Sequence, residues 1–409
     1  MFKKVKKCRV CSSTNLRQII NLGDQPPANS LMPKITNQKK IPLSLLFCNN
    51  CKLIQLSATV KPESLFSKYL WVTGTSDKVK DYRDDFLKKA NNYMIGKKVF
   101  EIASNDGFFL DAFKKKNYKV LGIDPAKNIA KQANKKKIKT IPKFFNFKNS
   151  KKIEKKYGKQ DLIICRNVIP HVDNINSVVK GISNLMHSKS ISLIEFHYAK
   201  LLYTKNHYDY IYHEHIFYYT LKSIMYLLNK HKLYGFDCFE SPISGGSIVL
   251  AISKKKRNIS RILKDKINIE KKLKINTLKF WKNFEKKCSM HKKKLLKIVN
   301  KFSIENKKIA GYGASARSST IINYCKLNNL TIKEIFDKNI LKNNLYTAGS
   351  NIKIKLPTKK RINNYDVILL LAWNFSEEII KFLRNKIKYK GLIINILPNI
   401  IIKNASLKN

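Results

Sequence analysis

The segment from 208 to 215 holds an unusual density of side chains that could carry protons. It contains three tyrosines, two histidines and two acids within eight positions. A single histidine is often a satisfied core residue, but such a cluster favours general acid and base catalysis, because histidine titrates near neutral pH. A zinc hydrolase site is the alternative. It is disfavoured because His213 and His215 are two positions apart, whereas helical zinc ligands are spaced about four apart.

Cysteine pairs near the N-terminus predict a metal site. Cys8 and Cys11 form one Cys-x-x-Cys pair, and Cys48 and Cys51 form another. Two such pairs present the four soft thiolates that tetrahedral zinc prefers. Incidental buried cysteines are the alternative, but four of the eight cysteines fall into this arrangement. A closed four-thiolate site leaves no open coordination position, so we expect a structural zinc.

A third group lies where a strand is expected to run into a helix. Residues 100–109 read as a strand, a turn containing Gly107 and the start of a helix, and Asp124 ends the next expected strand. A carboxylate at that position can accept hydrogen bonds from both hydroxyls of a ribose. The glycine lets the backbone approach a ligand closely. This pattern predicts a nucleoside-binding turn, although a plain strand-to-helix turn could share it.

The turn distinguishes between two nucleoside cofactors. NAD needs a Gly-x-Gly-x-x-Gly sequence to wrap its pyrophosphate around a helix N-terminus, and residues 104–107 lack it. S-Adenosylmethionine has no phosphate and tolerates the polar turn. The candidate cofactor residues are Glu101, Ser104, Asn105, Gly107, Asp124 and Asn167.

Apolar strands alternate with amphipathic helices from residue 97 onward, which is typical of a parallel sheet with helical crossovers. A polar helix is expected from about 77 to 92, and long exposed helices over about 258–306. Such a sheet binds its ligand at the carboxyl ends of its strands. The expected strands are 99–103, 120–123, 162–166 and 190–196 in a first region, and 309–312, 332–336, 367–372 and 391–396 in a second.

Composition limits the classes of partner. The 409 residues are 44% hydrophobic, which is enough for packed domains, and carry a formal net charge of +55. Such a charge could attract nucleic acid, but the lysine runs are scattered along the chain and do not alternate with aromatic residues. We therefore expect no nucleic-acid partner. With no apolar run of 18 residues and no signal-like N-terminus, we expect a cytoplasmic monomer with no membrane partner.

Taken together and in order, the motifs resemble one known family. They are the paired cysteines and residues 22–26, 101–107, 212–215, 245–247 and 311–314. The sequence resembles the sugar C-methyltransferases, which use S-adenosylmethionine, over essentially its whole length. The resemblance implies an α/β protein with two Rossmann-like doubly wound domains plus a small N-terminal zinc-binding module. We expect the zinc module over residues 1–62, the methyltransferase domain over 63–255 and the C-terminal Rossmann-like domain over 256–409.

The resemblance also implies a reaction and its catalytic residues. A nucleotide-linked 4-keto deoxysugar would be methylated at carbon 3, where the ketone acidifies the C–H bond. By the family pattern His215 is the base that removes this proton. Tyr212 and Glu214 are its close companions, and His171 lies near the same pocket. Glu214 is expected to orient the imidazole of His215, as carboxylates do for other catalytic histidines.

The C-terminal region carries a second glycine-rich turn. Residues 311–316 follow an expected strand and open a helix, and Asp337 ends the next strand. The resemblance implies that this domain helps to hold the sugar nucleotide, with the helix N-terminus and a nearby arginine suited to a diphosphate. Where the family pattern expects a tyrosine, position 71 is tryptophan. The expected substrate-binding residues are Tyr69, Trp71, Gly311, Gly313, Ala314, Arg317, Trp373 and Asn374.

Two other functions remain open from the sequence. An RNA methyltransferase would need the basic residues to form a coherent surface stripe. An NAD-dependent sugar-nucleotide enzyme would use residues 311–316 as its dinucleotide turn.

Overall fold

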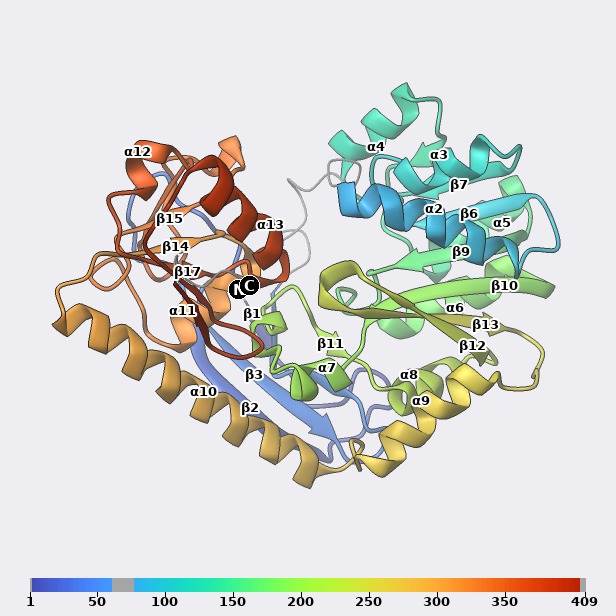
Figure 1. Cartoon of the computed structure of the whole chain (residues 1–409). Helices are drawn as coiled ribbons and strands as arrows, with labels where there is room; N and C mark the ends of the chain where they lie inside the picture. Colours follow the sequence, from blue (N-terminus) through green and yellow to red (C-terminus); the bar gives the residue numbers. More distant parts are fainter. Residues whose placement is uncertain (1, 61–76, 405–409) are drawn as a thin grey trace.

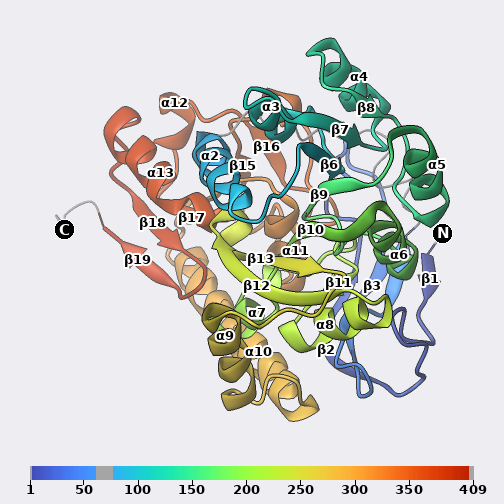
Figure 2. The same ribbon diagram turned by 90° about the vertical axis from the view of Figure 1, so that its right-hand side faces the viewer.

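The computed structural model describes residues 2–60 and 77–404 and forms two lobes above a shared layer (Figures 1 and 2). The substrate candidates Tyr69 and Trp71 lie outside the described residues. In Figure 1 the lobe on the right holds the first predicted α/β region, and the lobe on the left holds the second. The blue N-terminal strands lie below both lobes, so the N-terminal module is in a position to contact each of them.

The N-terminal residues form most of an antiparallel sheet. Its strands are β2 (Leu16–Gln25), β3 (Ile41–Cys48), β4 (Ile54–Leu56) and β11 (Phe217–Tyr218), in the order β11-β4-β3-β2. A separate two-stranded sheet pairs β1 (Phe2–Lys4) with β5 (Ala58–Val60). Because β11 comes directly after the segment 208–215, pairing of β11 with β4 ties that segment to the N-terminal module.

The first α/β region is built on a seven-stranded sheet. Its order is β12-β13-β10-β9-β6-β7-β8, with β13 antiparallel to its neighbours. The strands are β6 (Lys98–Ile102), β7 (Lys119–Ile123), β8 (Thr140–Ile141), β9 (Gln160–Arg166), β10 (Met186–His197), β12 (Tyr234–Ser241) and β13 (Ser247–Ser253). The predicted strands are confirmed here, and β12 and β13 are additional ones. The chain changes direction across the sheet between β6 and β9, which opens a ligand crevice at their carboxyl ends.

Helices cover both faces of this sheet. They are α2 (Asp77–Asn91), α3 (Phe108–Lys114), α4 (Lys127–Lys135), α5 (Phe147–Tyr157), α6 (Ile175–Leu185) and α8 (Leu221–Lys230). The short helix α7 (Lys200–Thr204) instead buries Leu202 in the core that contains the N-terminal strands. Strand β9 shows why the sheet needs two covers. Leu162 and Ile164 pack in one core with residues of α2 and α3, whereas Ile163 and Cys165 pack in another with residues of α5, α6 and α8. A strand buried on both faces reads as a continuous apolar run, as this one does.

The C-terminal region forms a second, six-stranded sheet. Its order β16-β15-β14-β17-β18-β19 is that of a Rossmann fold, with only β19 antiparallel. The strands are β14 (Ile309–Tyr312), β15 (Glu334–Phe336), β16 (Lys353–Lys355), β17 (Val367–Leu370), β18 (Leu392–Asn395) and β19 (Ile401–Lys403). The helices of this region are α11 (Ala316–Tyr324), α12 (Lys359–Ile362) and α13 (Ser376–Lys381). Two helices precede them: α9 (Arg261–Lys272), which packs against β12 and α8 of the first region, and α10 (Leu278–Ile304). The predicted α/β class with two doubly wound sheets is confirmed.

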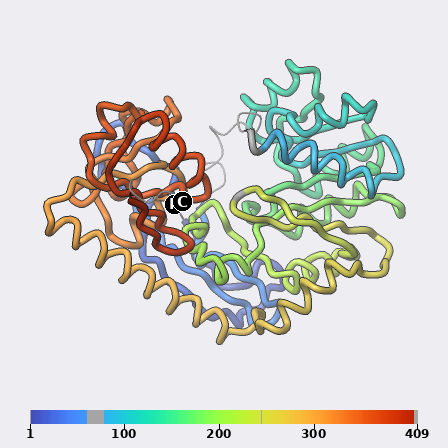
Figure 3. Tube along the Cα trace, viewed as in Figure 1, coloured from blue at the N-terminus to red at the C-terminus, as the bar shows by residue number. Residues whose placement is uncertain are grey.

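Helix α10 joins the parts into one core. It runs beneath the N-terminal strands and toward the C-terminal lobe (Figure 3). Its Trp281 and Leu295 are fully buried in a cluster that also contains Ile20 of β2 and Ile321 of α11. The N-terminal sheet and the C-terminal sheet therefore share apolar contacts and do not pack as isolated modules. Among the described helices, none has the length and apolarity needed to cross a bilayer.

Candidate active site

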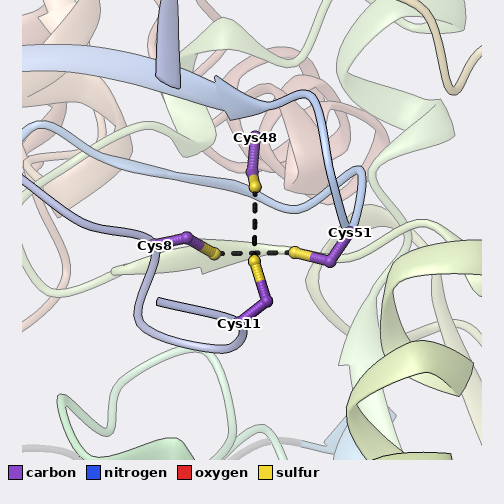
Figure 4. A group of neighbouring side chains, drawn as sticks. All are labelled: Cys8, Cys11, Cys48 and Cys51. Atoms are coloured by element: carbon purple, nitrogen blue, oxygen red, sulfur yellow. Dashed lines mark hydrogen bonds between the residues drawn. The ribbon is translucent and has the colours of Figure 1, made fainter. Parts of the chain in front are cut away.

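The four predicted zinc ligands converge on one point. Their sulfur atoms lie within 4.8 Å of one another, and the side chains point to a common centre (Figure 4). The Sγ atoms of Cys8 and Cys51 are 3.5 Å apart, and those of Cys11 and Cys48 are 3.6 Å apart. A zinc ion with bonds of about 2.3 Å holds tetrahedral thiolates roughly 3.8 Å apart, so the cluster fits zinc. Such a closed site stabilises the module and leaves no position for a substrate.

The predicted cofactor turn has a strained backbone. Ala103, Asn105 and Gly107 have φ angles of 54°, 50° and 76°. A Cβ atom at Gly107 would lie 2.8 Å from Cγ2 of Ile138, so both the left-handed conformation and the lack of space require glycine. Strain of this kind persists where the surrounding structure enforces it and is frequent at ligand sites.

Asp124 closes the same turn from the end of β7. Its two carboxylate oxygens accept hydrogen bonds from the backbone N–H groups of Asn105 and Ala126, each at 2.9 Å. Burial raises the pKa of this carboxyl group. Each oxygen keeps a second lone pair, so the carboxylate can still accept ribose hydroxyls while it holds the turn.

Several buried polar atoms beside this turn and at the carboxyl ends of β6 and β9 have no hydrogen-bond partner among the described residues. They are Oε2 of Glu101, Oγ of Ser104, Oδ1 of Asp106 and Oδ1 of Asn167. Buried polar atoms are nearly always paired, so a group of four at one sheet edge indicates the place of a polar ligand. Arg166 donates to Oε1 of Glu101 at 2.8 Å, while burial raises the pKa of Glu101 to about 7. Acceptor atoms of this kind fit a cofactor that carries ammonium and hydroxyl groups.

His215 has both of its ring nitrogens engaged. Nδ1 lies 2.9 Å from the carbonyl oxygen of Tyr210, which can only accept, so Nδ1 carries the proton. Nε2 therefore has a lone pair, and it lies 2.8 Å from the hydroxyl of Tyr212. The pKa of His215 is well below its usual value because the ring is buried and lies beside His171 and Arg317. The structure thus presents a neutral imidazole whose Nε2 can take up a proton.

The other expected catalytic residues lie close by. The rings of His171 and His215 are 4.8 Å apart between centroids. Nδ1 of His171 donates to the carbonyl oxygen of Glu214 at 2.7 Å. The carboxylate of Glu214 accepts a hydrogen bond from Asn29 at 2.5 Å, and burial raises its pKa. The expectation that Glu214 orients the imidazole of His215 is wrong, because the Tyr210 carbonyl occupies Nδ1.

Loop residues of the first α/β region join this cluster to the cofactor crevice. His171 follows Asn167 in the loop that leaves the carboxyl end of β9. The carbonyl oxygen of Pro170 in this loop accepts the backbone N–H of Ile216 at 2.6 Å. His197 ends β10 at the same edge and stacks on the ring of Tyr210 at 3.7 Å. The predicted base and the cofactor residues therefore meet at one edge of the seven-stranded sheet.

The C-terminal domain reaches the segment through Asp209. Arg317 donates to both carboxylate oxygens of Asp209 at 2.8 and 3.2 Å, and the indole N–H of Trp373 donates to one of them at 2.7 Å. Asn374 lies beside Trp373 in the short helix Trp373–Phe375. Asp209 is fully buried, and sequence reasoning missed it as a site residue. The available signal was its position within the acid- and histidine-rich segment.

The glycine-rich turn of the C-terminal domain packs closely against the residues that follow β17, and this contact requires glycine. A Cβ atom at Gly313 would lie 2.3 Å from Cβ of Ala372, and one at Gly311 would lie 2.6 Å from Cδ1 of Leu371. Asp337 accepts a hydrogen bond from the backbone N–H of Ala314 at 2.9 Å and forms an ion pair with Lys342 at 3.2 Å. Asp337 is thus held by two backbone N–H groups in the same way as Asp124, and in addition it pairs with Lys342.

Comparison with known proteins assigns the family. Three family models match in order: "Putative zinc binding domain" over 8–66, "Methyltransferase domain" over 75–239 and "C-methyltransferase C-terminal domain" over 242–398. The chain is also 27% identical over 395 residues to the C-methyltransferase NovU of Streptomyces niveus, covering 94% of each protein. This chain belongs to the C-methyltransferase family. The C-methyltransferase is an S-adenosylmethionine-dependent enzyme, and the family resemblance of its sequence is confirmed.

Solved structures of methyltransferases resemble part of this chain. An S-adenosylmethionine-dependent methyltransferase from Clostridium acetobutylicum matches with 14% identity and a TM-score of 0.35, covering 44% of this chain and 94% of its own. Magnesium protoporphyrin IX methyltransferase from Synechocystis matches with 12% identity and a TM-score of 0.36, covering 48% and 99%.

Proposed function

We propose that the enzyme methylates the carbon next to the ketone of a nucleotide-linked keto-deoxysugar, with His215 as the base. One observation carries this proposal. Nε2 of His215 has a lone pair and lies at the same sheet edge as the unpartnered polar atoms of the predicted cofactor turn. A base beside a methyl donor is what C-methylation needs, because a carbon must lose a proton before it can attack.

The proposed reaction has two steps, removal of a proton from carbon and transfer of a methyl group to that carbon. The ketone acidifies the neighbouring C–H bond, Nε2 of His215 takes the proton, and the electron pair remains as an enolate. The bound cofactor supplies an electrophilic methyl group on a sulfonium. The enolate carbon forms the new C–C bond with this methyl group as the S–C bond breaks and the sulfur becomes a neutral thioether. Tyr212, released from Nε2 by the substrate, is a hydrogen-bond donor for the enolate oxygen.

Burial of His215 suits this role. A histidine whose pKa lies well below its usual value is almost entirely neutral at pH 7, so its base form is present without a further activating group. The enolate intermediate is anionic, and the cofactor sulfonium would favour negative charge beside the base.

The sugar nucleotide is proposed from the family resemblance and from the C-terminal domain beside the base. The domain bounds 1–62, 63–255 and 256–409 belong to the same proposal, as do the substrate-binding residues other than Arg317 and Trp373, whose side chains bind Asp209. The ion pair between Asp337 and Lys342 speaks against an NAD enzyme, because the ribose hydroxyls would have to compete with the ammonium group for the carboxylate.

Exchange of the acidic proton with solvent tests the proposal. The enzyme would be incubated in deuterium oxide with a panel of nucleotide-linked keto-sugars and with S-adenosylhomocysteine, which has no methyl group to transfer. We expect deuterium at the carbon next to the ketone of at least one sugar, detected by mass spectrometry, and methylation of that sugar when S-adenosylmethionine is added. Failure of every keto-sugar to exchange and to accept a methyl group would overturn the proposed substrate.

A further inference from the structure

Side chains of the C-terminal domain bind the short helix Tyr208–Tyr210, which precedes His215, the proposed base, by five residues. Arg317, in the first turn of α11, binds the Asp209 carboxylate with two nitrogens, and Trp373 adds a third hydrogen bond. One turn further along α11, Thr320 donates to the carbonyl oxygen of Ile211 at 2.8 Å. The catalytic segment is thus held from the C-terminal lobe on both sides of Tyr210.

The ion pair is a strong fixing point because it is buried. The Asp209 side chain is 0% exposed and that of Arg317 is 12% exposed. A buried carboxylate needs its countercharge and its hydrogen bonds together, and the bidentate arrangement fixes direction as well as distance. Asp209 therefore has little freedom to move relative to α11.

Tyr210 transmits this constraint to His215. It directly follows Asp209, and its carbonyl oxygen is the acceptor for Nδ1–H of His215 at 2.9 Å. Its ring is stacked between His197 at 3.7 Å and His215 at 4.2 Å. The position of Tyr210 thus determines both the tautomer of His215 and the direction of its Nε2 lone pair.

We propose that Asp209, clamped by Arg317 and Trp373, is a positioning residue that holds the base tautomer and orientation of His215. The inference rests on the proposed role of His215 as the base. The C-terminal domain then contributes to catalysis by orienting a residue of another domain. The logic is that of a carboxylate that orients a catalytic histidine, except that here a backbone carbonyl stands between the two groups.

A competing role for Arg317 leads to a different result. If Arg317 served to bind the diphosphate of the substrate, then Asp209 would compete with that diphosphate for the guanidinium. Asp209→Asn would then leave turnover intact and would keep or improve substrate affinity. If Asp209 positions the base, the same substitution lowers turnover without weakening either ligand, because the base acts in the transition state.

The test compares three variants of the full chain. Asp209→Asn removes the charge with little change in shape, Trp373→Phe removes only one donor, and Glu334→Gln is a matched control that breaks the remote ion pair with Arg361. We expect Asp209→Asn to lower kcat and the rate of deuterium exchange about tenfold to a hundredfold. KM for the sugar nucleotide and the Kd for S-adenosylmethionine should stay within about twofold of wild type. Trp373→Phe should lose less, and Glu334→Gln should match wild type.

A spectroscopic readout separates positioning from general stability. Ring ¹⁵N chemical shifts of His215, assigned by comparison with His215→Asn, should show a single Nδ1–H tautomer in wild type and a mixture of tautomers in Asp209→Asn. Should Asp209→Asn fail to fold, Trp373→Phe gives the same readouts with a smaller change. Wild-type turnover, exchange and tautomer in a folded Asp209→Asn, or in Trp373→Phe if that is the variant measured, would overturn the inference.

The same experiment keeps the two proposals apart. Absence of exchange in wild type with every keto-sugar contradicts the proposed function. Exchange that is lost in His215→Asn but normal in Asp209→Asn contradicts only the positioning role. Asp209→Asn could instead raise KM, weaken cofactor binding and lower thermal stability together while the His215 tautomer stays unchanged. That result would assign Asp209 a structural role and also overturn the inference.

Discussion

The hydroxyl of Tyr212 lies 2.8 Å from Nε2 of His215 and donates a hydrogen bond to that nitrogen. The direction of this hydrogen bond follows from the other ring nitrogen. The Tyr210 carbonyl fixes the proton on Nδ1, so Nε2 can only accept. In this state Nε2 of His215 is unprotonated and accepts a hydrogen bond from the neutral hydroxyl of Tyr212. Under the proposed mechanism the substrate replaces Tyr212 at Nε2 before proton transfer, which would link binding of the substrate to exposure of the base.

Replacement of His215 should separate chemistry from binding. We expect His215→Asn to lower methyl transfer at least about a hundredfold, because a positioned base contributes this much to the rate. Calorimetry should show unchanged affinities for S-adenosylmethionine and the sugar nucleotide. His187→Asn, which alters a histidine paired with Asp161 away from the cluster, is the control. Full exchange of the keto-sugar proton in His215→Asn would assign the base to another residue, with His171 the next candidate.

The cysteine cluster should bind one zinc ion per chain. Elemental analysis of protein purified without chelator should give a ratio near one, because the four sulfur atoms already have the spacing of a tetrahedral site. Cys48→Ser should lose the metal and lower the melting temperature, since metal binding in such sites contributes to folding. Cys238→Ser, at a buried cysteine of β12, should keep the zinc. Zinc-free wild-type protein with unchanged stability would refute the assignment.

Asp124 should contribute to cofactor affinity. We expect Asp124→Asn to weaken S-adenosylmethionine binding by about 1 to 3 kcal/mol, because an amide cannot replace a carboxylate that accepts several hydrogen bonds. The backbone N–H groups of Asn105 and Ala126 also lose part of their partner, so a small loss of stability should accompany it. Asp161→Asn, at the start of β9, serves as the comparison. Equal affinity in wild type and Asp124→Asn, measured by calorimetry, would place the ribose elsewhere.

The buried histidines should make the enzyme sensitive to acid. Burial lowers the pKa of His213 to about 4, whereas an unfolded histidine titrates at about 6.5. Between these values the unfolded state binds the additional proton, so the free energy of unfolding falls as the pH falls, by up to roughly 3 kcal/mol for such a group. His213→Gln removes this term. Urea unfolding at pH 7 and pH 4.5 should therefore show a smaller loss for His213→Gln than for wild type, and equal losses would contradict the prediction.

Local sequence was sufficient for the parts of the protein that depend on spacing and periodicity. The two Cys-x-x-Cys pairs predict their own cluster, because zinc imposes one geometry on four thiolates. The apolar runs predict β6, β7, β9 and β10, because a strand buried on both faces has to be apolar throughout. The turn at Gly107 was readable because a glycine between an apolar strand and a helix marks a turn, and the structure gives this glycine a positive φ.

Tertiary structure alone decided how the catalytic segment is held. Asp209 meets Arg317 across 108 positions and Trp373 across 164. Strand β11 pairs with β4 of the N-terminal module. No periodicity or spacing encodes such contacts, because they arise when separate domains pack and bury a charge that then needs a partner. For the same reason the sequence suggested Glu214 as the group that orients His215, while the fold gave that role to the carbonyl of Tyr210.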